Sequence, residues 1–278
     1  MLTALHIEKK QHKNKVVGLL SKLLPDKINV EIKSADGIKL KCITYLGRRE
    51  KVNFSKIDRL IGAQRNRLLC AEDSKITTAQ GYKRFSDNVF KKRLCTNLCL
   101  ELLRLCKKEK LKVGFVDIDC ELSFFTKYLL KYCDSLSVVT YDVKYYSDFC
   151  EELMYETGVS VRVSKKFSSL SDCDIVIAPE YMDFSVNLKD SAVVLCTRKP
   201  DITPVYTVVY DYTATLPKEL SSLKTDFLSD TYIMSALYTM KMMYDLGSIV
   251  PSLCVCENSV HTIESLKNSV LKACKNLT

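Results

Sequence analysis

Three acidic residues directly follow a short apolar segment, and their side chains could carry chemistry. Asp117, Asp119 and Glu121 lie at and just after the carboxyl end of KVGFVDI (112–118), a segment typical of a buried strand. If that segment is the first strand of a parallel sheet, its carboxyl end is where such sheets bind ligands. Carboxylates can hold Mg²⁺ there together with water, so Asp117 and Asp119 are candidate catalytic and metal-binding residues. We favour the structural alternative, in which these acids stabilise the N-terminus of the following helix.

Further candidates follow the next strands of the same region. Thr140 and Asp142 end the segment SLSVVTYD, and Pro179 follows CDIVIA. Together with Glu121, they are candidate cofactor-binding residues at one edge of the predicted sheet. The local alternatives are that Asp142 caps the next helix, which we favour, and that Pro179 only ends a strand.

The elements that would position these residues follow from hydrophobic periodicity. From residue 111, short β-branched segments alternate with helical ones, which predicts a parallel sheet covered by helices. Upstream, an i, i+3, i+4 pattern predicts a long helix over 86–109, capped by Ser86 or Asp87. The sequence also predicts a hairpin at Asp36-Gly37. Further segments are predicted as helices at 16–24, 55–64, 123–132, 144–157, 229–245 and from 262, and as a strand at 66–71.

The stretch 111–200 resembles a Rossmann-like NAD(P)-binding unit, because its second predicted strand ends in an acid, Asp142, 28 residues after Gly114. This resemblance implies a doubly wound α/β fold. The order of a first α/β region, a long helix and a nucleotide domain is similar to that of shikimate-dehydrogenase-like enzymes. The chain as a whole resembles proteins of Gram-positive anaerobes that carry no established activity.

The glycine pattern departs from that family. The chain has 8 glycines and no G-x-G, which excludes the usual dinucleotide and Walker A loops. The acids 117, 119 and 121 stand where glycines would let a pyrophosphate approach, and they would repel it. The same absence of glycines argues against an S-adenosylmethionine methyltransferase, because the first loop of that family is also glycine-rich. Asp-x-Asp after a strand also resembles haloacid-dehalogenase-type phosphatases, which implies Asp117 as nucleophile, Asp119 as acid/base and Thr140 as phosphate ligand, but the later motifs of that family are missing.

The charge is unevenly distributed. The net charge of the chain is +9, whereas residues 1–110 alone carry 26 Lys and Arg against 11 Asp and Glu. Such a basic region could contact nucleic-acid phosphates. We favour a solvated surface or docking against the acidic remainder, because no known nucleic-acid motif is present.

Cysteine usage indicates a reducing compartment. The chain has 13 cysteines, an odd number, and many fall in apolar helix or strand positions. With neither a signal-peptide pattern nor a membrane-length apolar run, we expect a cytoplasmic protein. The pair Cys254-x-Cys256 near His261 is a weak zinc motif, since a fourth ligand is not evident.

We therefore predict an α/β protein with a basic N-terminal α/β region (1–85), a connecting helix (86–110) and a Rossmann-like domain (111–278) with a mostly parallel sheet. The favoured function is a ligand-binding or regulatory module with a degenerate nucleotide site, whose partner is a small molecule or a protein. One alternative is a metal-assisted enzyme that uses Asp117, Asp119 and Glu121. The other is a nucleic-acid-associated protein. The identity of any cofactor stays open.

Overall fold

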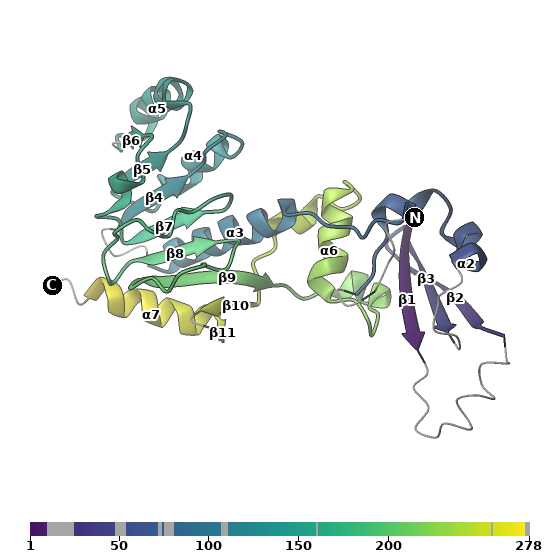
Figure 1. The fold of residues 1–278 in the computed structure, drawn as a ribbon. Coiled ribbons are helices and arrows are strands. Elements are labelled where there is room, and N and C mark those ends of the chain that lie inside the picture. The colour runs from purple at the N-terminus through teal and green to yellow at the C-terminus, as the bar shows by residue number, and fades with distance from the viewer. Residues whose placement is uncertain are drawn as a thin grey trace. The chain divides into compact units, whose positions relative to one another are not determined.

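The computed structural model describes residues 1–9, 25–47, 54–71, 74, 81–106, 111–159, 161–256 and 258–275. The predicted helix at 16–24 lies outside these residues. The chain forms two compact units, which are coloured by residue number in Figure 1. Unit 1 comprises residues 1–87 and 216–242, and unit 2 comprises residues 88–215 and 243–278.

This division differs from the predicted domain boundaries. The long helix belongs to unit 2, and residues 216–242, which we expected in the C-terminal domain, belong to unit 1. Two long-range hydrogen bonds hold this segment to the N-terminal sheet. Lys33 Nζ donates to the Lys224 carbonyl oxygen (2.6 Å), and Ser222 Oγ donates to the Ser34 carbonyl oxygen (2.6 Å).

Unit 1 contains a three-stranded sheet in the order β1-β3-β2. Its strands are β1 (Leu2–Lys9), β2 (Lys27–Ala35) and β3 (Ile38–Gly47). Strands β2 and β3 form the predicted hairpin, and β1 pairs with β3 in parallel. At the turn, Asp36 and Gly37 have φ angles of 47° and 75°. Positive φ at both central positions matches the twist of the flanking strands.

The helices of unit 1 pack around this sheet. Helix α2 (Phe54–Ile61) buries Phe54, Ile57 and Ile61 against Leu5 and Tyr45 of the sheet. The predicted strand at 66–71 is reduced to isolated bridges. The remaining helical segments are the 3₁₀ helices η1 (Gly62–Arg67) and η5 (Lys218–Leu223) and the α-helix α6 (Asp230–Thr239).

Unit 2 is built on an eight-stranded sheet in the order β11-β10-β9-β8-β7-β4-β5-β6. The first six of these strands in the chain are all parallel and follow the 3-2-1-4-5-6 order of the Rossmann fold. This arrangement confirms the predicted α/β fold with a mostly parallel sheet. The strands are β4 (Lys112–Val116), β5 (Ser135–Val139), β6 (Val161–Ser164), β7 (Ile175–Ala178), β8 (Val193–Cys196), β9 (Thr207–Thr213), β10 (Leu253–Cys256) and β11 (Ser259–Thr262).

The helices of unit 2 differ from prediction mainly in length. Helix α3 (Val89–Leu105) confirms the long helix, but its N-cap is Asn88, which makes no side-chain cap bond. The predicted helix at 123–132 shrinks to a 3₁₀ turn, η3 (Ser123–Phe125), followed by the short α4 (Thr126–Leu129). The other segments are α5 (Val143–Thr157), η4 (Phe167–Leu170), η6 (Asp245–Ser248) and α7 (Ile263–Lys275). In the described part of the chain, every helix is too short or too polar to cross a membrane.

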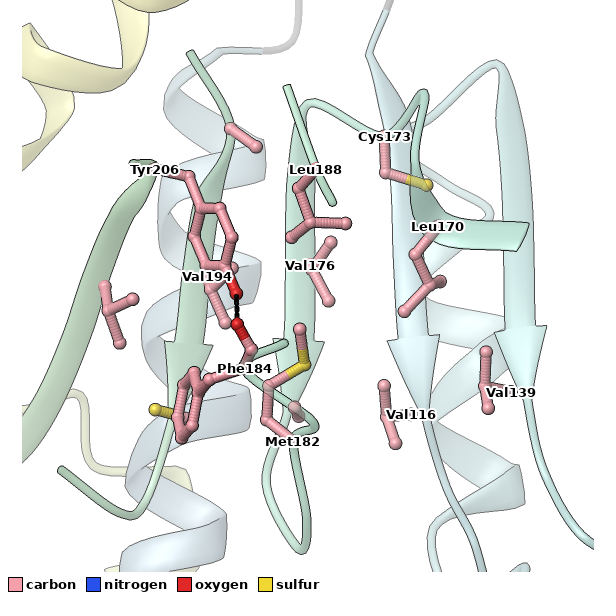
Figure 2. Packing of buried hydrophobic residues seen from close by; sticks show 14 of the residues in the cluster. Val116, Val139, Leu170, Cys173, Val176, Met182, Phe184, Leu188, Val194 and Tyr206 are labelled. Atoms are coloured by element: carbon pink, nitrogen blue, oxygen red, sulfur yellow. Dashed lines mark hydrogen bonds between the residues drawn. The ribbon is translucent and has the colours of Figure 1, made fainter. Parts of the chain in front are cut away.

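A coil covers part of the sheet where a helix would be expected. Figure 2 shows the apolar cluster that the central strands form, with Val116, Val176 and Val194 on one face. Residues 179–192 connect β7 to β8 and pack onto this cluster. The Tyr206 hydroxyl donates to the Phe184 carbonyl oxygen (3.1 Å) and anchors the coil. The other coil residues in the cluster are Met182, Leu188 and Ala192.

Gly114 in β4 allows this cluster to pack closely. A Cβ atom at this position would lie 2.8 Å from Leu170 Cδ2 and 3.2 Å from Cys173 Sγ. We therefore predict that Gly114→Ala lowers the free energy of unfolding by about 1–3 kcal/mol, the usual cost of overpacking a core. Urea unfolding would measure this. A variant as stable as the parent would show that the loop at 167–174 does not pack tightly on β4.

Candidate functional site

The candidate site lies at the carboxyl ends of β4, β5 and β7. The strand order reverses between β4 and β7, and ligands of open α/β sheets bind at such a switch point. The loop that follows β4 begins at Asp117, the segment that follows β5 begins at Thr140, and Pro179 follows β7. The topology therefore brings the sequence-predicted candidates to the same edge of the sheet.

The loop after β4 is held to the segment after β5 by backbone hydrogen bonds. Asp117 N donates to the Val139 carbonyl oxygen (3.0 Å), and Tyr141 N donates to the Ile118 carbonyl oxygen (3.1 Å). The buried Thr140 hydroxyl also donates to the Ile118 carbonyl oxygen (3.2 Å). Thr140 thus supports the loop from within rather than facing a ligand.

Without glycine, this loop still adopts a left-handed turn. Cys120 has a φ of 60°, a conformation that costs a residue with a Cβ about 1–2 kcal/mol. Its Sγ lies 3.2 Å from Thr140 Oγ1. The loop therefore follows a sharp course that a glycine would adopt without this cost, and contacts with β5 hold it there.

Asp117 occupies the centre of the loop and is completely buried. Its carboxylate accepts a hydrogen bond from the Tyr146 hydroxyl (2.7 Å) and from Leu122 N (3.2 Å to each oxygen). Burial raises the pKa of Asp117 above its usual value, although these two hydrogen bonds act in the opposite direction. In a glycine-rich loop, backbone N–H groups at this place bind phosphate. Here the Asp117 carboxylate accepts the hydrogen bond of one such group, Leu122 N.

Glu121 belongs to a second group of charges. Lys92 Nζ of α3 lies 3.3 Å from Glu121 Oε2 and 2.5 Å from Glu180 Oε1. Burial lowers the pKa of Lys92, but the two glutamates outweigh this effect and raise it. Glu121 is thus engaged in an ion pair, and Pro179 is buried beside Glu180 with its carbonyl oxygen accepting from Thr197 Oγ1 (2.9 Å).

Sequence reasoning missed the role of Lys92. Lys92 belongs to the basic stretch 1–110, whose charges we expect to be solvated or docked against the acidic remainder, but nothing in the sequence singles it out. Its partners, Glu121 and Glu180, are 29 and 88 residues away. No local sequence pattern predicts a contact between residues so far apart in the chain. The signal that existed was Glu180, an acid at the end of a predicted buried strand.

A groove lies beside the Asp117 loop, between the ends of β4 and β5. It has a volume of about 650 Å³ and is lined by Asp119, Cys120, Asp142, Ile118, Tyr141 and Tyr145. Asp142 caps α5, because its Oδ1 accepts from Tyr145 N (3.0 Å). Two of the predicted site residues, Asp119 and Asp142, therefore share an accessible groove.

The structure offers little for the metal hypotheses. Within the described ranges, no three His, Cys, Asp or Glu side chains come together as a metal site would require. Asp117 is completely buried, and both of its oxygens already accept hydrogen bonds within the protein. Cys254 and His261 lie opposite each other on β10 and β11, but Cys254 Sγ contacts the His261 carbonyl oxygen (3.8 Å) and not its ring.

Comparison with known proteins gives only distant likenesses. No family model and no curated protein matches the chain. Among solved structures, L-tryptophan dehydrogenase from Nostoc punctiforme covers 99% of this chain and 86% of its own, at 10% identity and a TM-score of 0.36. Δ¹-Pyrroline-2-carboxylate reductase from Thermococcus litoralis covers 37% and 35%, at 10% identity and a TM-score of 0.29, so the chain spans about a third of that enzyme.

A mycolic acid cyclopropane synthase covers 62% of this chain and 60% of its own, at 12% identity and a TM-score of 0.27. Likenesses this weak support no statement about activity. The Rossmann-like description rests instead on the strand order within unit 2. The resemblance to proteins of Gram-positive anaerobes stays a prediction.

The buried Asp117 predicts a specific pH dependence. Because its pKa is raised, the folded protein binds this proton more tightly than the unfolded chain, so stability is lost as pH rises above the unfolded value of about 4. We expect Asp117→Asn to gain stability relative to the parent between pH 4.5 and 7. The gain in the free energy of unfolding should be about 1.4 kcal/mol for each tenfold difference in the proton affinity of Asp117 between the folded and the unfolded parent.

Urea unfolding at both pH values measures this difference, with Asp119→Asn, an exposed acid of the same loop, as the matched control. If the stability difference between Asp117→Asn and the parent does not change with pH, the carboxylate is not the buried titrating group described here.

Proposed function

We propose that unit 2 is a binding module for a small nucleoside-like molecule that presents hydroxyl groups and an aromatic ring but no pyrophosphate. The observation that carries this proposal is the groove at the ends of β4 and β5, which combines acids and exposed tyrosines. In dinucleotide-binding sheets of this strand order, an acid near the end of the second strand binds ribose hydroxyls.

Two carboxylates in the groove can serve as hydroxyl acceptors. Asp119 is exposed on the loop after β4, and Asp142 uses only Oδ1 for the helix cap. Oδ2 of Asp142 can therefore accept from a ligand hydroxyl without loss of the cap. An ionised carboxylate forms stronger hydrogen bonds than a neutral acceptor.

Aromatic side chains in the same groove can stack on a base. Tyr141 and Tyr145 are 61% and 48% exposed, so both rings are accessible to a ligand. Offset stacking on such rings adds about 0.5–1.5 kcal/mol to binding. The groove thus provides both a polar and an aromatic contact.

The charges argue against phosphate at this place. Leu122 N is occupied by Asp117, and Asp119 and Glu121 add negative charge to the same loop. The helix that follows has only four residues, so its dipole offers little compensation. A ligand that lacks phosphate avoids this repulsion.

Calorimetric titration with adenosine, AMP and NAD⁺ tests the proposal. We expect adenosine to bind and each added phosphate to weaken binding. Asp142→Asn should keep the helix cap but replace the Oδ2 acceptor with a donor, and should weaken adenosine binding about tenfold, as expected for a lost charge-assisted hydrogen bond. Asp148→Asn, on the same helix, is the matched control.

Tight binding of NAD⁺ would contradict the proposal, and so would a panel without any binding. S-adenosylmethionine and Mg²⁺ belong in the same series. A response to Mg²⁺ that Asp119→Asn abolishes would instead favour the alternative of a metal-assisted enzyme using Asp117, Asp119 and Glu121, which is less well supported because Asp117 is already engaged.

A further inference from the structure

Unit 1 contains a pocket of its own, separate from the groove described in unit 2. It has a volume of about 330 Å³ and lies where two chain segments run side by side. Lys83 N donates to the Arg65 carbonyl oxygen (2.7 Å), Leu68 N to the Lys83 carbonyl oxygen (3.0 Å), and Phe85 N to the Leu68 carbonyl oxygen (2.9 Å). This pairing sets Arg67 beside Lys83 and Arg84, and all three line the pocket.

Two of these cations lack a protein counter-charge. Arg67 and Lys83 are exposed and make no ion pair with any residue that the structure describes. Arg65, which is two residues from Arg67 in the chain and accepts a backbone hydrogen bond from Lys83 N, is paired with Asp58. The pocket thus contains two cations, Arg67 and Lys83, that have no counter-charge among the residues that the structure describes.

The third cation is positioned by its surroundings. Arg84 Nε donates to the Cys70 carbonyl oxygen (3.0 Å), and its guanidinium carbon lies 4.7 Å from the centre of the Tyr232 ring. A guanidinium held by hydrogen bonding and by stacking loses little entropy on binding an anion. Arg84 is therefore well suited to recognise the oxygens of a phosphate.

A buried hydroxyl in the same pocket also indicates a ligand. Thr239 Oγ1, at the end of α6, is buried and lacks a hydrogen-bond partner in the described structure. Buried polar atoms are nearly always hydrogen-bonded. Asp87 lines the pocket as well, so a bare anion would not suit every part of it. A ligand with hydroxyl groups would give the Thr239 hydroxyl a partner and could also donate to the Asp87 carboxylate.

The charge of unit 1 favours an anionic ligand. This unit carries 22 Lys and Arg against 12 Asp and Glu, a net charge of +10, whereas unit 2 carries 20 against 21. A strong positive field raises the local concentration of anions and their association rates.

We propose that this pocket binds a phosphate group attached to a hydroxylated sugar. Arg67, Lys83 and Arg84 bind the phosphate, and Asp87 and Thr239 bind the sugar hydroxyls. Two sources supply this chemistry: a free sugar phosphate, or the backbone of single-stranded RNA, which has a 2′-hydroxyl that DNA lacks.

The test uses the full chain with three probes: ribose 5-phosphate by calorimetry, and fluorescein-labelled single-stranded RNA and DNA by anisotropy. The variant Arg67→Ala/Lys83→Ala removes the two cations that have no counter-charge. The control Lys39→Ala/Arg59→Ala removes the same charge from exposed positions of unit 1 outside the pocket. Thermal unfolding confirms that both remain folded.

We expect the pocket variant to weaken binding about tenfold or more, as expected when charge-assisted hydrogen bonds are lost, and the control to change it little. Binding of ribose 5-phosphate would identify a free sugar phosphate, and preference for RNA over DNA would identify the RNA backbone. Equal losses in both variants would mean diffuse charge attraction and overturn the proposal, as would the absence of binding to all three probes. Asp142→Asn, which tests the groove in unit 2, should leave these affinities unchanged.

Discussion

The hydrogen bonds of the Asp117 carboxylate are the constraint on which the candidate site depends. This side chain is buried at the end of β4. It accepts one hydrogen bond from Leu122 N in the loop and another from the Tyr146 hydroxyl of α5, and so connects the loop to that helix. In a glycine-rich loop, backbone N–H groups at this place remain available for a pyrophosphate. Here an anion of the protein itself takes one of them. The loop is thereby completed without a phosphate, and ligand contacts fall to the neighbouring groove.

A buried carboxylate is costly, and its surroundings show how that cost is offset. Two hydrogen-bond donors satisfy Asp117, while nearby Glu180 and Glu121 share the cation of Lys92. Without that lysine, several acids would meet at the end of the sheet with no counter-charge. The long helix α3 therefore contributes a charge to the site as well as an apolar face to the core.

The fold was largely predictable because it follows from local patterns. Short apolar segments predicted the parallel strands. The residue types at Asp36-Gly37 and at Asp142 predicted the hairpin turn and the helix cap. The contacts of Lys92 and the association of residues 216–242 with unit 1 were not predictable, because both join segments far apart in the chain. Strand β10 was missed because its two cysteines were interpreted as a zinc motif, and β11 because it is a mostly exposed edge strand without an apolar run.

The most direct test of the central claim follows the backbone amide of Leu122 by ¹⁵N NMR. If Asp117 occupies this N–H, adding pyrophosphate leaves the resonance unchanged, whereas lowering the pH through the raised pKa of Asp117 shifts it as the carboxylate is protonated. A saturable shift with pyrophosphate at constant pH would contradict the account, because it would show that the loop still binds phosphate despite its acids.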